Sequence, residues 1–245
     1  MILIYILVST LIISTGALVG IFTLSIKEAL LQKALLSLVG FSSGALLGGA
    51  FLHLMPEGIE DLPTQTFFLL VLGAIVLYLL IEKTLHWHHC HQQHCEAHSI
   101  GYMNLVGDAV HNFIDGLIVA ASFIVSVPLG ITTVIAIGLH EIPQEIGDFG
   151  VLLYAGFSKG KALLYNFIVA LMVVVGGIVG WVLSSFVDDI TTYLIPIAAG
   201  GFIYIAVSDL IPELRKKSSY SAFIVNFLLL LAGIAFMFLV KFIGE

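Results

Sequence analysis

Charged residues are scarce in this chain, and their scarcity indicates its class. Lys, Arg, Asp and Glu make up 10% of the 245 residues, hydrophobic residues make up 60%, and the mean hydropathy is +1.12. A soluble domain of this size could not cover so much apolar surface with so few charges. The sequence therefore predicts an integral membrane protein whose surroundings are the lipid bilayer.

Basic residues and cysteines are also few. Nine basic residues against sixteen acidic ones give a net charge of −7, which argues against nucleic acid and anionic lipid surfaces as partners. The two cysteines, Cys90 and Cys95, lie in a loop that we predict to be cytosolic, so no disulfide framework is expected. No Walker-type phosphate loop occurs, which argues against ATP. The first hydrophobic segment lacks a basic n-region and a small-residue cleavage pattern, so we expect a retained span.

Long hydrophobic stretches alternate with short polar ones. A helix needs about 20 apolar residues to cross the hydrocarbon core. By this criterion we predict eight spans, at 2–26, 34–54, 66–82, 100–126, 130–154, 162–186, 191–211 and 221–243. The expected fold is an all-α integral membrane protein with one transmembrane domain over residues 1–245, which includes a histidine-rich loop at 83–99.

The basic residues predict the orientation of these spans. Cytoplasmic loops carry the excess of Lys and Arg in membrane proteins. Eight of the nine basic residues fall in the loops that follow the odd-numbered spans, and Lys241 is the exception; the eight are Lys27, Lys33, Lys83, Lys159, Lys161, Arg215, Lys216 and Lys217. We therefore expect both the N- and C-termini outside, in a multi-pass protein of the cell (cytoplasmic) membrane.

A short motif occurs twice. Residues 54–57 read LMPE and residues 210–213 read LIPE, and each copy follows a polar residue (His53, Asp209) and a glycine-rich stretch. The two copies lie on spans that cross in opposite directions, which indicates inverted repeats in a 3+2+3 arrangement, as in alternating-access transporters. The alternative is a chance recurrence of a helix-ending motif.

Two polar stripes run along the fourth and fifth spans. They recur at helical spacing and consist of Asn104, Asp108, His111, Asn112 and Asp115 on the fourth span, and His140, Glu141, Gln144, Glu145 and Asp148 on the fifth. Each charged side chain at the bilayer centre costs roughly 2.5–3.5 kcal/mol, so the stripes are expected to face inward. Imidazoles, carboxylates and amides together suit a divalent ion such as zinc, iron, manganese or cadmium. A structural hydrogen-bond network is the alternative.

Proline and glycine residues accompany the stripes. Pro143 frees the backbone carbonyl of Leu139 one turn earlier, and in a membrane this carbonyl needs water or another partner. We therefore expect a wet cavity beside the fifth stripe. Four glycines are expected to let neighbouring backbones approach closely: Gly107, Gly116, Gly138 and Gly147.

The segments HNFIDG at 111–116 and HEIPQE at 140–145 resemble the paired signatures of the ZIP (Zrt/Irt-like) family of metal transporters, closest to its LIV-1-like branch. The resemblance extends over nearly the whole chain. It implies a non-enzymatic protein without a catalytic cofactor, which moves a divalent cation, most simply Zn²⁺, into the cytosol through a site midway across the membrane.

The resemblance also implies ligands by position. The first metal site would comprise His111, Asp115, His140 and Gln144. A second metal would be held by Asn112, Asp115, Glu141 and Gln144, with Asn166 of the sixth span, and Asp108, Glu145 and Asp148 are further candidates. Gln144 departs from the family pattern, which has histidine or glutamate there, so a neutral and weaker ligand is expected to change affinity or metal preference.

A histidine-rich tract occupies residues 86–98. Neutral imidazoles and thiolates bind zinc-class metals, and the tract contains His86, His88, His89, Cys90, His91, His94, Cys95 and His98. We expect this loop to receive or sense metal on the cytosolic side, with an incidental polar loop as the alternative.

An intramembrane di-metal enzyme, such as a histidine-box oxidase or a lipid hydrolase, is the competing hypothesis. Such an enzyme needs several histidine clusters that converge at one membrane face, whereas His53, His111 and His140 lie on separate spans. A metal sensor with inert spans is a third hypothesis. The sequence leaves open whether one or two metals bind and whether the chain forms a homodimer.

Overall fold

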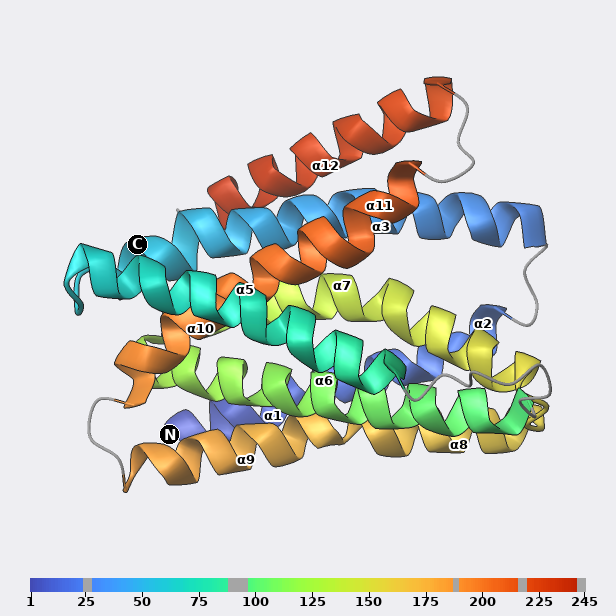
Figure 1. The fold of residues 1–245 in the computed structure, drawn as a ribbon, viewed down its shortest axis with the longest axis horizontal. Coiled ribbons are helices and arrows are strands. Elements are labelled where there is room, and N and C mark those ends of the chain that lie inside the picture. The colour runs from blue at the N-terminus through green and yellow to red at the C-terminus, as the bar shows by residue number, and fades with distance from the viewer. Residues whose placement is uncertain (24–27, 88–96, 187–189, 216–219, 242–245) are drawn as a thin grey trace.

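The computed structural model describes residues 1–23, 28–87, 97–186, 190–215 and 220–241 (Figure 1). Within these ranges every regular element is helical, and the elements join end to end into eight rods. The rods are α1–η1–α2 (Ile2–Ser14, Thr15–Val19, Gly20–Thr23), α3–η2–α4 (Glu28–Gly48, Gly49–Leu54, Met55–Gly58), α5 (Thr64–Trp87), α6 (Ala97–Val125), α7 (Val127–Tyr154), α8–α9 (Lys159–Ala170, Met172–Ser184), α10–η3–α11 (Ile190–Tyr204, Ile205–Leu210, Ile211–Arg215) and α12 (Tyr220–Lys241). Residues 88–96 of the predicted histidine-rich loop lie outside the described residues.

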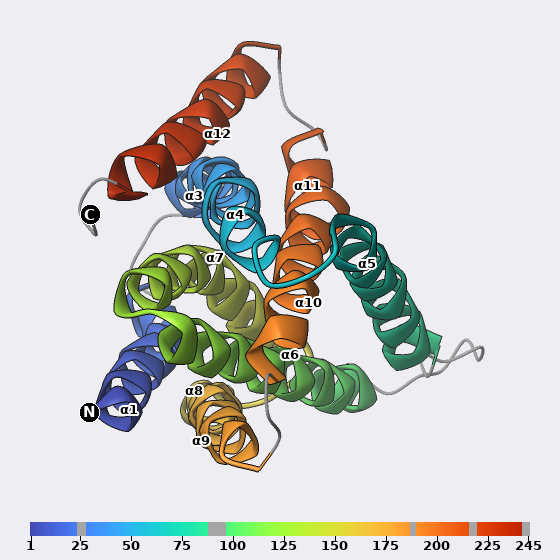
Figure 2. The same cartoon turned by 90° about the vertical axis from the view of Figure 1, so that its left-hand side faces the viewer.

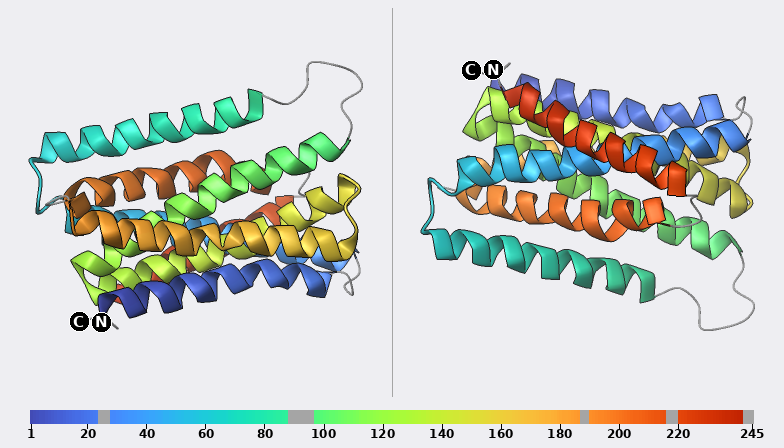
Figure 3. Two further views of the ribbon diagram at one scale, coloured as in Figure 1. Left: turned by 90° about the horizontal axis from the view of Figure 1, so that it is seen from below. Right: turned by 90° about the horizontal axis from the view of Figure 1, so that it is seen from above.

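Seven of the rods are long and apolar enough to cross a membrane. The qualifying stretches are Ile2–Val19, Ala34–Gly58, Thr64–Ile81, Asn104–Val125, Lys159–Ser184, Ile190–Leu214 and Ser221–Val240. The remaining rod, α7, carries the acidic residues of the fifth stripe and runs beside α6 (Figures 1 and 3). The all-α membrane class predicted from composition is confirmed.

Three helix boundaries differ from the predicted span bounds at prolines. The predicted ends at 54 and 211 are passed by helices that continue to Gly58 and Arg215, and α7 begins at Val127, not at 130. In each case a proline lies in the first turn of the helical segment that continues or begins there. At the start of α7 the missing N–H of Pro128 has no intrahelical partner, whereas Pro56 and Pro212 lie within continuous rods, where the preceding π turn accommodates the missing donor. At α7 the hydroxyl of Ser126 also caps the helix by accepting the N–H of Leu129 at 3.2 Å.

The two LxPE motifs follow the same local irregularity. The π-helical segments η2 and η3, six residues each, directly precede α4 and α11. Proline has no backbone N–H, so the carbonyl one turn earlier loses its hydrogen-bond donor. A π turn commonly accommodates an extra residue within a helix. The second and seventh rods therefore share both the motif and its wider turn.

The end-on view shows α6 and α7 in the middle of the bundle (Figure 2). The rods α1 and α8–α9 pack on one side of this pair, and α3 and α10 pack on the other. The rods α5 and α12 lie at the periphery, where only 22% of their apolar windows is buried. The start of α1 and the end of α12 lie at the same end of the bundle (Figure 3).

A pair of glycines brings α6 and α9 into backbone contact. A Cβ on Gly116 would overlap the carbonyl oxygen of Val173, and a Cβ on Gly176 would overlap that of Phe113. Such small-residue contacts are typical of membrane helix interfaces. The expectation of close approach is confirmed for Gly116, but it is wrong for Gly107, Gly138 and Gly147, where no described atom beyond the glycine's own stretch of helix lies within 4 Å of the position of a Cβ.

Replacing Gly116 by alanine should therefore destabilise the bundle by about 1–3 kcal/mol, because the added methyl group overpacks the α6–α9 contact. Gly107→Ala on the same helix is the matched control, and its unfolding midpoint should stay level or rise, since alanine favours the helix. Thermal unfolding of the purified protein in detergent measures both. Equal midpoints for the two variants would contradict the packing assigned to Gly116.

Candidate metal centre

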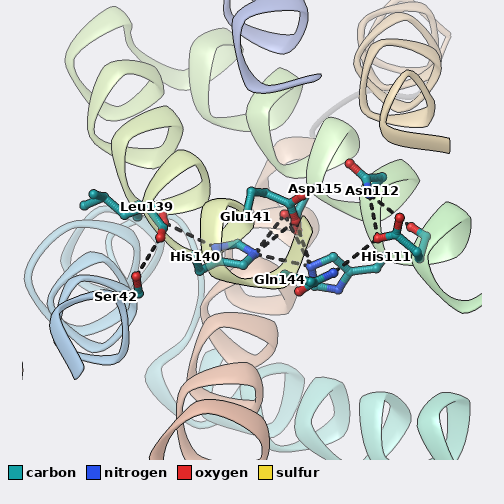
Figure 4. A network of polar contacts seen from close by, with 10 residues as sticks. Ser42, His111, Asn112, Asp115, Leu139, His140, Glu141 and Gln144 are labelled. Atoms are coloured by element: carbon teal, nitrogen blue, oxygen red, sulfur yellow. Dashed lines mark hydrogen bonds and ion pairs between the residues drawn. The ribbon is translucent and has the colours of Figure 1, made fainter. Parts of the chain in front are cut away.

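The polar stripes of α6 and α7 face each other at the centre of the bundle. His111 and Asp115 lie one turn apart on α6, and His140 and Glu141 are consecutive residues on α7. One ligand atom from each of the four lies within 4.8 Å of the ligand atoms of the others. Asp115, His140 and Glu141 are almost completely buried, and the His111 side chain is 19% exposed. Figure 4 shows the two imidazoles pointing toward one another with the carboxylates beside them.

Five of the six distances between the four ligand atoms lie between 3.2 and 3.7 Å. His140 Nε2 lies 3.3 Å from His111 Nε2, 3.2 Å from Asp115 Oδ2 and 3.5 Å from Glu141 Oε1. His111 Nε2 lies 3.2 Å from Glu141 Oε1 and 3.7 Å from Asp115 Oδ2. In a tetrahedral zinc site with bonds of about 2.0–2.1 Å, neighbouring ligand atoms are roughly 3.3 Å apart. The spacing therefore suits one ion of zinc size at the centre of the four atoms.

The hydrogen bond on the far side of His140 determines which ring nitrogen faces the cluster. Nδ1 lies 3.3 Å from the carbonyl oxygen of Ala136, an acceptor, so Nδ1 carries the proton and donates it. In the neutral imidazole, Nε2 then presents its lone pair to the cluster, as a metal-ligating histidine does. Phe202 of α10 contacts the same ring edge-on at 6.4 Å between centroids.

The carboxylates lack hydrogen-bond donors. Both oxygens of Asp115 and Oε1 of Glu141 are buried and accept no hydrogen bond. Buried polar atoms are nearly always paired, and unpaired buried charge is costly. Two carboxylates and the lone pair of His140 Nε2 converge on the His111 ring nitrogen, the one possible donor that the described residues bring to them, and a cation would stabilise this arrangement.

The other acidic residues of the stripes are paired with carboxamides. Gln144 and Asn112 both donate to Oδ1 of Asp108, at 3.3 and 2.9 Å. Asn104 donates to Asp148 at 2.9 Å, and Asn166 of α8 donates to the carboxylate and to the backbone carbonyl of Glu145. The residues predicted from the sequence thus form one cluster of four possible metal ligands. Beside it, three further acidic residues each accept hydrogen bonds from carboxamide side chains.

This arrangement differs from the predicted grouping at two positions. Glu141, predicted for a second metal, lies in the cluster with His111, Asp115 and His140. Gln144, predicted for the first metal, donates its amide to Asp108. The metal-ligating role of each residue remains a prediction.

The carbonyl freed by Pro143 has a partner that sequence reasoning did not identify. The buried hydroxyl of Ser42, on α3, donates to the carbonyl oxygen of Leu139 at 2.6 Å (Figure 4). The proline predicts that the carbonyl needs a donor, but the donor is 97 residues away in sequence, and only the packing of α3 on α7 identifies it. The expected wet cavity remains a prediction.

Ser42→Ala should destabilise the protein by about 1–3 kcal/mol, because it leaves a buried carbonyl without a donor. Ser43→Ala is the matched control, since the Ser43 hydroxyl bonds the carbonyl of Val39 in its own helix, where the backbone already supplies a partner. Chemical unfolding in mixed micelles measures both. A Ser43 variant as unstable as the Ser42 variant would contradict a special role for the α3–α7 bond.

Comparison with known proteins agrees with this geometry. The family model described as ZIP Zinc transporter matches residues 1–100 and 88–241. The chain belongs to the ZIP zinc transporter family. The family assignment predicted from HNFIDG and HEIPQE is thus confirmed.

Several ZIP relatives are similar over most of the chain. It is 31% identical to zinc transporter zipt-7.2 of Caenorhabditis elegans and 35% identical to zinc transporter ZIP13 of Pongo abelii, over 83% and 82% of its length. These matches cover 57% and 65% of the two relatives, so the chain spans less than two thirds of either. Human zinc transporter ZIP10 is 38% identical over 52% of the chain and 17% of its own length. ZIP13 and ZIP10 belong to the LIV-1 subfamily, the branch that the motifs resemble.

Proposed function

We propose that this protein transports zinc across a membrane through the cluster on α6 and α7. The observation that supports the proposal most directly is the set of four mutually close ligand atoms in buried surroundings, on helices that carry the ZIP signature segments. A transporter needs such a site inside the bilayer, because a hydrated divalent ion cannot enter the hydrocarbon region without replacement ligands.

The proposed first ligand sphere is His111, Asp115, His140 and Glu141. Its nitrogen and oxygen atoms suit zinc, and they would also accept iron, manganese or cadmium. The second set proposed from the family comprises Asn112, Asp115, Glu141 and Gln144 with Asn166. Asp108, Glu145 and Asp148 are further candidates along the same two helices.

The proposed mechanism is alternating access within a 3+2+3 inverted-repeat fold, with both termini outside and uptake directed into the cytosol. The matching π turns before the two LxPE motifs support the repeat, and the common end of α1 and α12 agrees with an even number of crossings. The membrane potential would contribute about 4.6 kcal/mol per 100 mV to a divalent ion, twice the value for one charge. No ATP is required.

The remaining assignments follow from the sequence. We place the protein in the cell membrane, treat residues 1–245 as one transporter domain, and assign the histidine-rich segment at 83–99, whose two ends lie in α5 and α6, to receiving or sensing cytosolic metal. A homodimer is compatible with the exposed apolar faces of α5 and α12, which lipid would equally cover. The competing di-metal enzyme gains no support from the described residues, in which two imidazoles converge rather than several histidine clusters.

Radiometal uptake by the purified chain in proteoliposomes tests the proposal. Zinc should accumulate inside the vesicles with saturation kinetics and without ATP, and unlabelled iron, manganese and cadmium should compete according to their affinities. Protein-free liposomes give the leak rate. Uptake at the leak rate by folded, correctly inserted protein would overturn the transport function.

A further inference from the structure

One carboxylate oxygen receives two carboxamide groups beside the cluster. Oδ1 of Asp108 accepts the amide of Asn112 at 2.9 Å, one turn later on α6, and the amide of Gln144 at 3.3 Å from α7. The Asn112 amide also reaches the backbone carbonyl of Asp108 at 3.2 Å. Asp108 is 6% exposed and Asn112 is fully buried. Asp108 therefore links the two helices through their amide groups.

The chemistry of these groups determines how the amides are turned. A carboxamide has a donor end and an acceptor end, whereas a carboxylate only accepts hydrogen bonds. Asp108 therefore holds the NH₂ ends of Asn112 and Gln144 and leaves their oxygen atoms facing elsewhere. Oδ1 of Asn112 is buried and has no hydrogen-bond partner, which is unusual for an amide oxygen in a protein interior.

The residues that carry these oxygens lie next to cluster residues on the two helices. Asn112 follows His111 in the chain, and Gln144 lies one helical turn beyond His140. A cation near the cluster would attract an amide oxygen and repel an amide NH₂. An amide that is free to rotate would present both ends, so an anchored donor end favours metal binding.

We propose that Asp108 is a positioning residue that holds the Asn112 and Gln144 carboxamides with their oxygens available to the metal ion. In this role Asp108 acts through these two amides, as an alternative to the ligand role for which it is a further candidate above. The inference rests on the proposed function, because it assumes that a cation binds between α6 and α7. It differs from roles in which Asp108 binds metal or accepts a proton, since those roles require its negative charge.

Three variants of the full chain separate these roles. Asp108→Leu removes the acceptor, Asp108→Asn keeps an acceptor oxygen but removes the charge, and Asn112→Ala/Gln144→Ala removes the two amides. The readout is the zinc dissociation constant of protein in lipid nanodiscs, measured by equilibrium dialysis with ⁶⁵Zn. Asp108→Leu should weaken zinc binding about 10- to 100-fold, the usual effect of losing a group that orients a ligand. Asp108→Asn should bind at least about tenfold tighter than Asp108→Leu.

The double-variant background decides whether the amides carry the effect. Adding Asp108→Leu to Asn112→Ala/Gln144→Ala should change the dissociation constant by no more than about twofold, because nothing remains to be oriented. Thr133→Val is the matched control: it removes another buried hydrogen bond between α7 and α6, from Thr133 to Ser122 at 3.0 Å, and it should leave zinc affinity unchanged.

Two results would overturn the inference: Asp108→Asn as weak as Asp108→Leu, or a full loss from Asp108→Leu in the background that lacks both amides. Either result would mean that the charge of Asp108 acts directly. Failure of the proposed function would be seen in a different experiment, as an absence of zinc uptake by vesicles that contain the wild-type protein. The zinc dissociation constants of the variants can still be compared in that case. If Asp108→Leu does not fold, Asp108→Asn is compared with the wild-type protein: a loss of less than about tenfold supports the positioning role, and a loss of about 100-fold overturns it, because only the charge has been removed.

Discussion

Replacing His140 by alanine should abolish high-affinity zinc binding and zinc uptake together. His140 Nε2 lies 3.2–3.5 Å from the other three ligand atoms of the cluster, and its Nδ1 hydrogen bond to Ala136 fixes the ring in a ligating tautomer. Loss of a group that only supports a ligand costs about 10- to 100-fold in metal affinity, so loss of this ligand should cost more than about 100-fold. His111→Ala and Asp115→Ala should act in the same direction.

Two measurements check the His140 prediction. Uptake into vesicles reports transport, and the unfolding midpoint with and without zinc reports binding. At 100 times the dissociation constant, zinc should stabilise the wild-type protein by about 2.7 kcal/mol, and this gain should disappear in His140→Ala.

His53→Ala is the matched control for loss of an imidazole. His53 is also buried, but its Nε2 contacts the carbonyl oxygen of Met237 at 2.9 Å, in the contact between η2 and α12. This variant can lower the unfolding midpoint, yet it should retain the zinc-dependent rise. A normal zinc response in His140→Ala would disprove the proposed site.

The second large effect should distinguish Glu141 from Gln144. Glu141→Gln keeps the shape of the side chain but removes the charge of an oxygen that lies 3.2 Å from His111 Nε2 and accepts no hydrogen bond. We expect zinc affinity to fall about 100-fold or more, because charged ligands interact far more strongly with a divalent ion than amides do in a buried site. Gln144→Ala should cost about tenfold or less.

The comparison of these two variants distinguishes the ligand assignment based on the structure from the one based on the family motif. Position within the ZIP motif places Gln144 in the first metal site, whereas the structure brings Glu141 into the cluster and pairs Gln144 with Asp108. Zinc titrations of the two variants under identical conditions are sufficient. A larger loss from Gln144→Ala than from Glu141→Gln would restore the assignment that the family resemblance implies.

Hydrophobicity and polar periodicity predicted the helical class and the pairing of α6 with α7 well. A run of apolar residues is sufficient to define a membrane helix, and residues at helical spacing necessarily share a face. The family motifs then identified the helices that carry the cluster. These properties are local, so the sequence expresses them directly.

Properties that depend on packing were predicted less well. His140 and Glu141 are neighbours on one broad polar face, and periodicity does not tell which of Glu141 and Gln144 reaches His111. Glycine composition likewise does not distinguish Gly116, which contacts α9, from Gly107, where an added Cβ would meet no described atom beyond its own stretch of helix within 4 Å. Two helices continue past the predicted span ends at 54 and 211, through Pro56 and Pro212, and the π segments that precede these prolines are not evident from polar periodicity.

The carboxamide partners of the buried acidic residues have a consequence for cation binding. Asp108, Glu145 and Asp148 accept hydrogen bonds from neutral amides, and the described lysines at 83, 159 and 161 are exposed at the ends of their rods. A lysine or arginine beside these carboxylates would neutralise them permanently and would compete with any mobile cation. Each amide donates to one oxygen of its carboxylate without bringing a positive charge, so a divalent cation that reached these residues would not have to displace a lysine or arginine side chain from them.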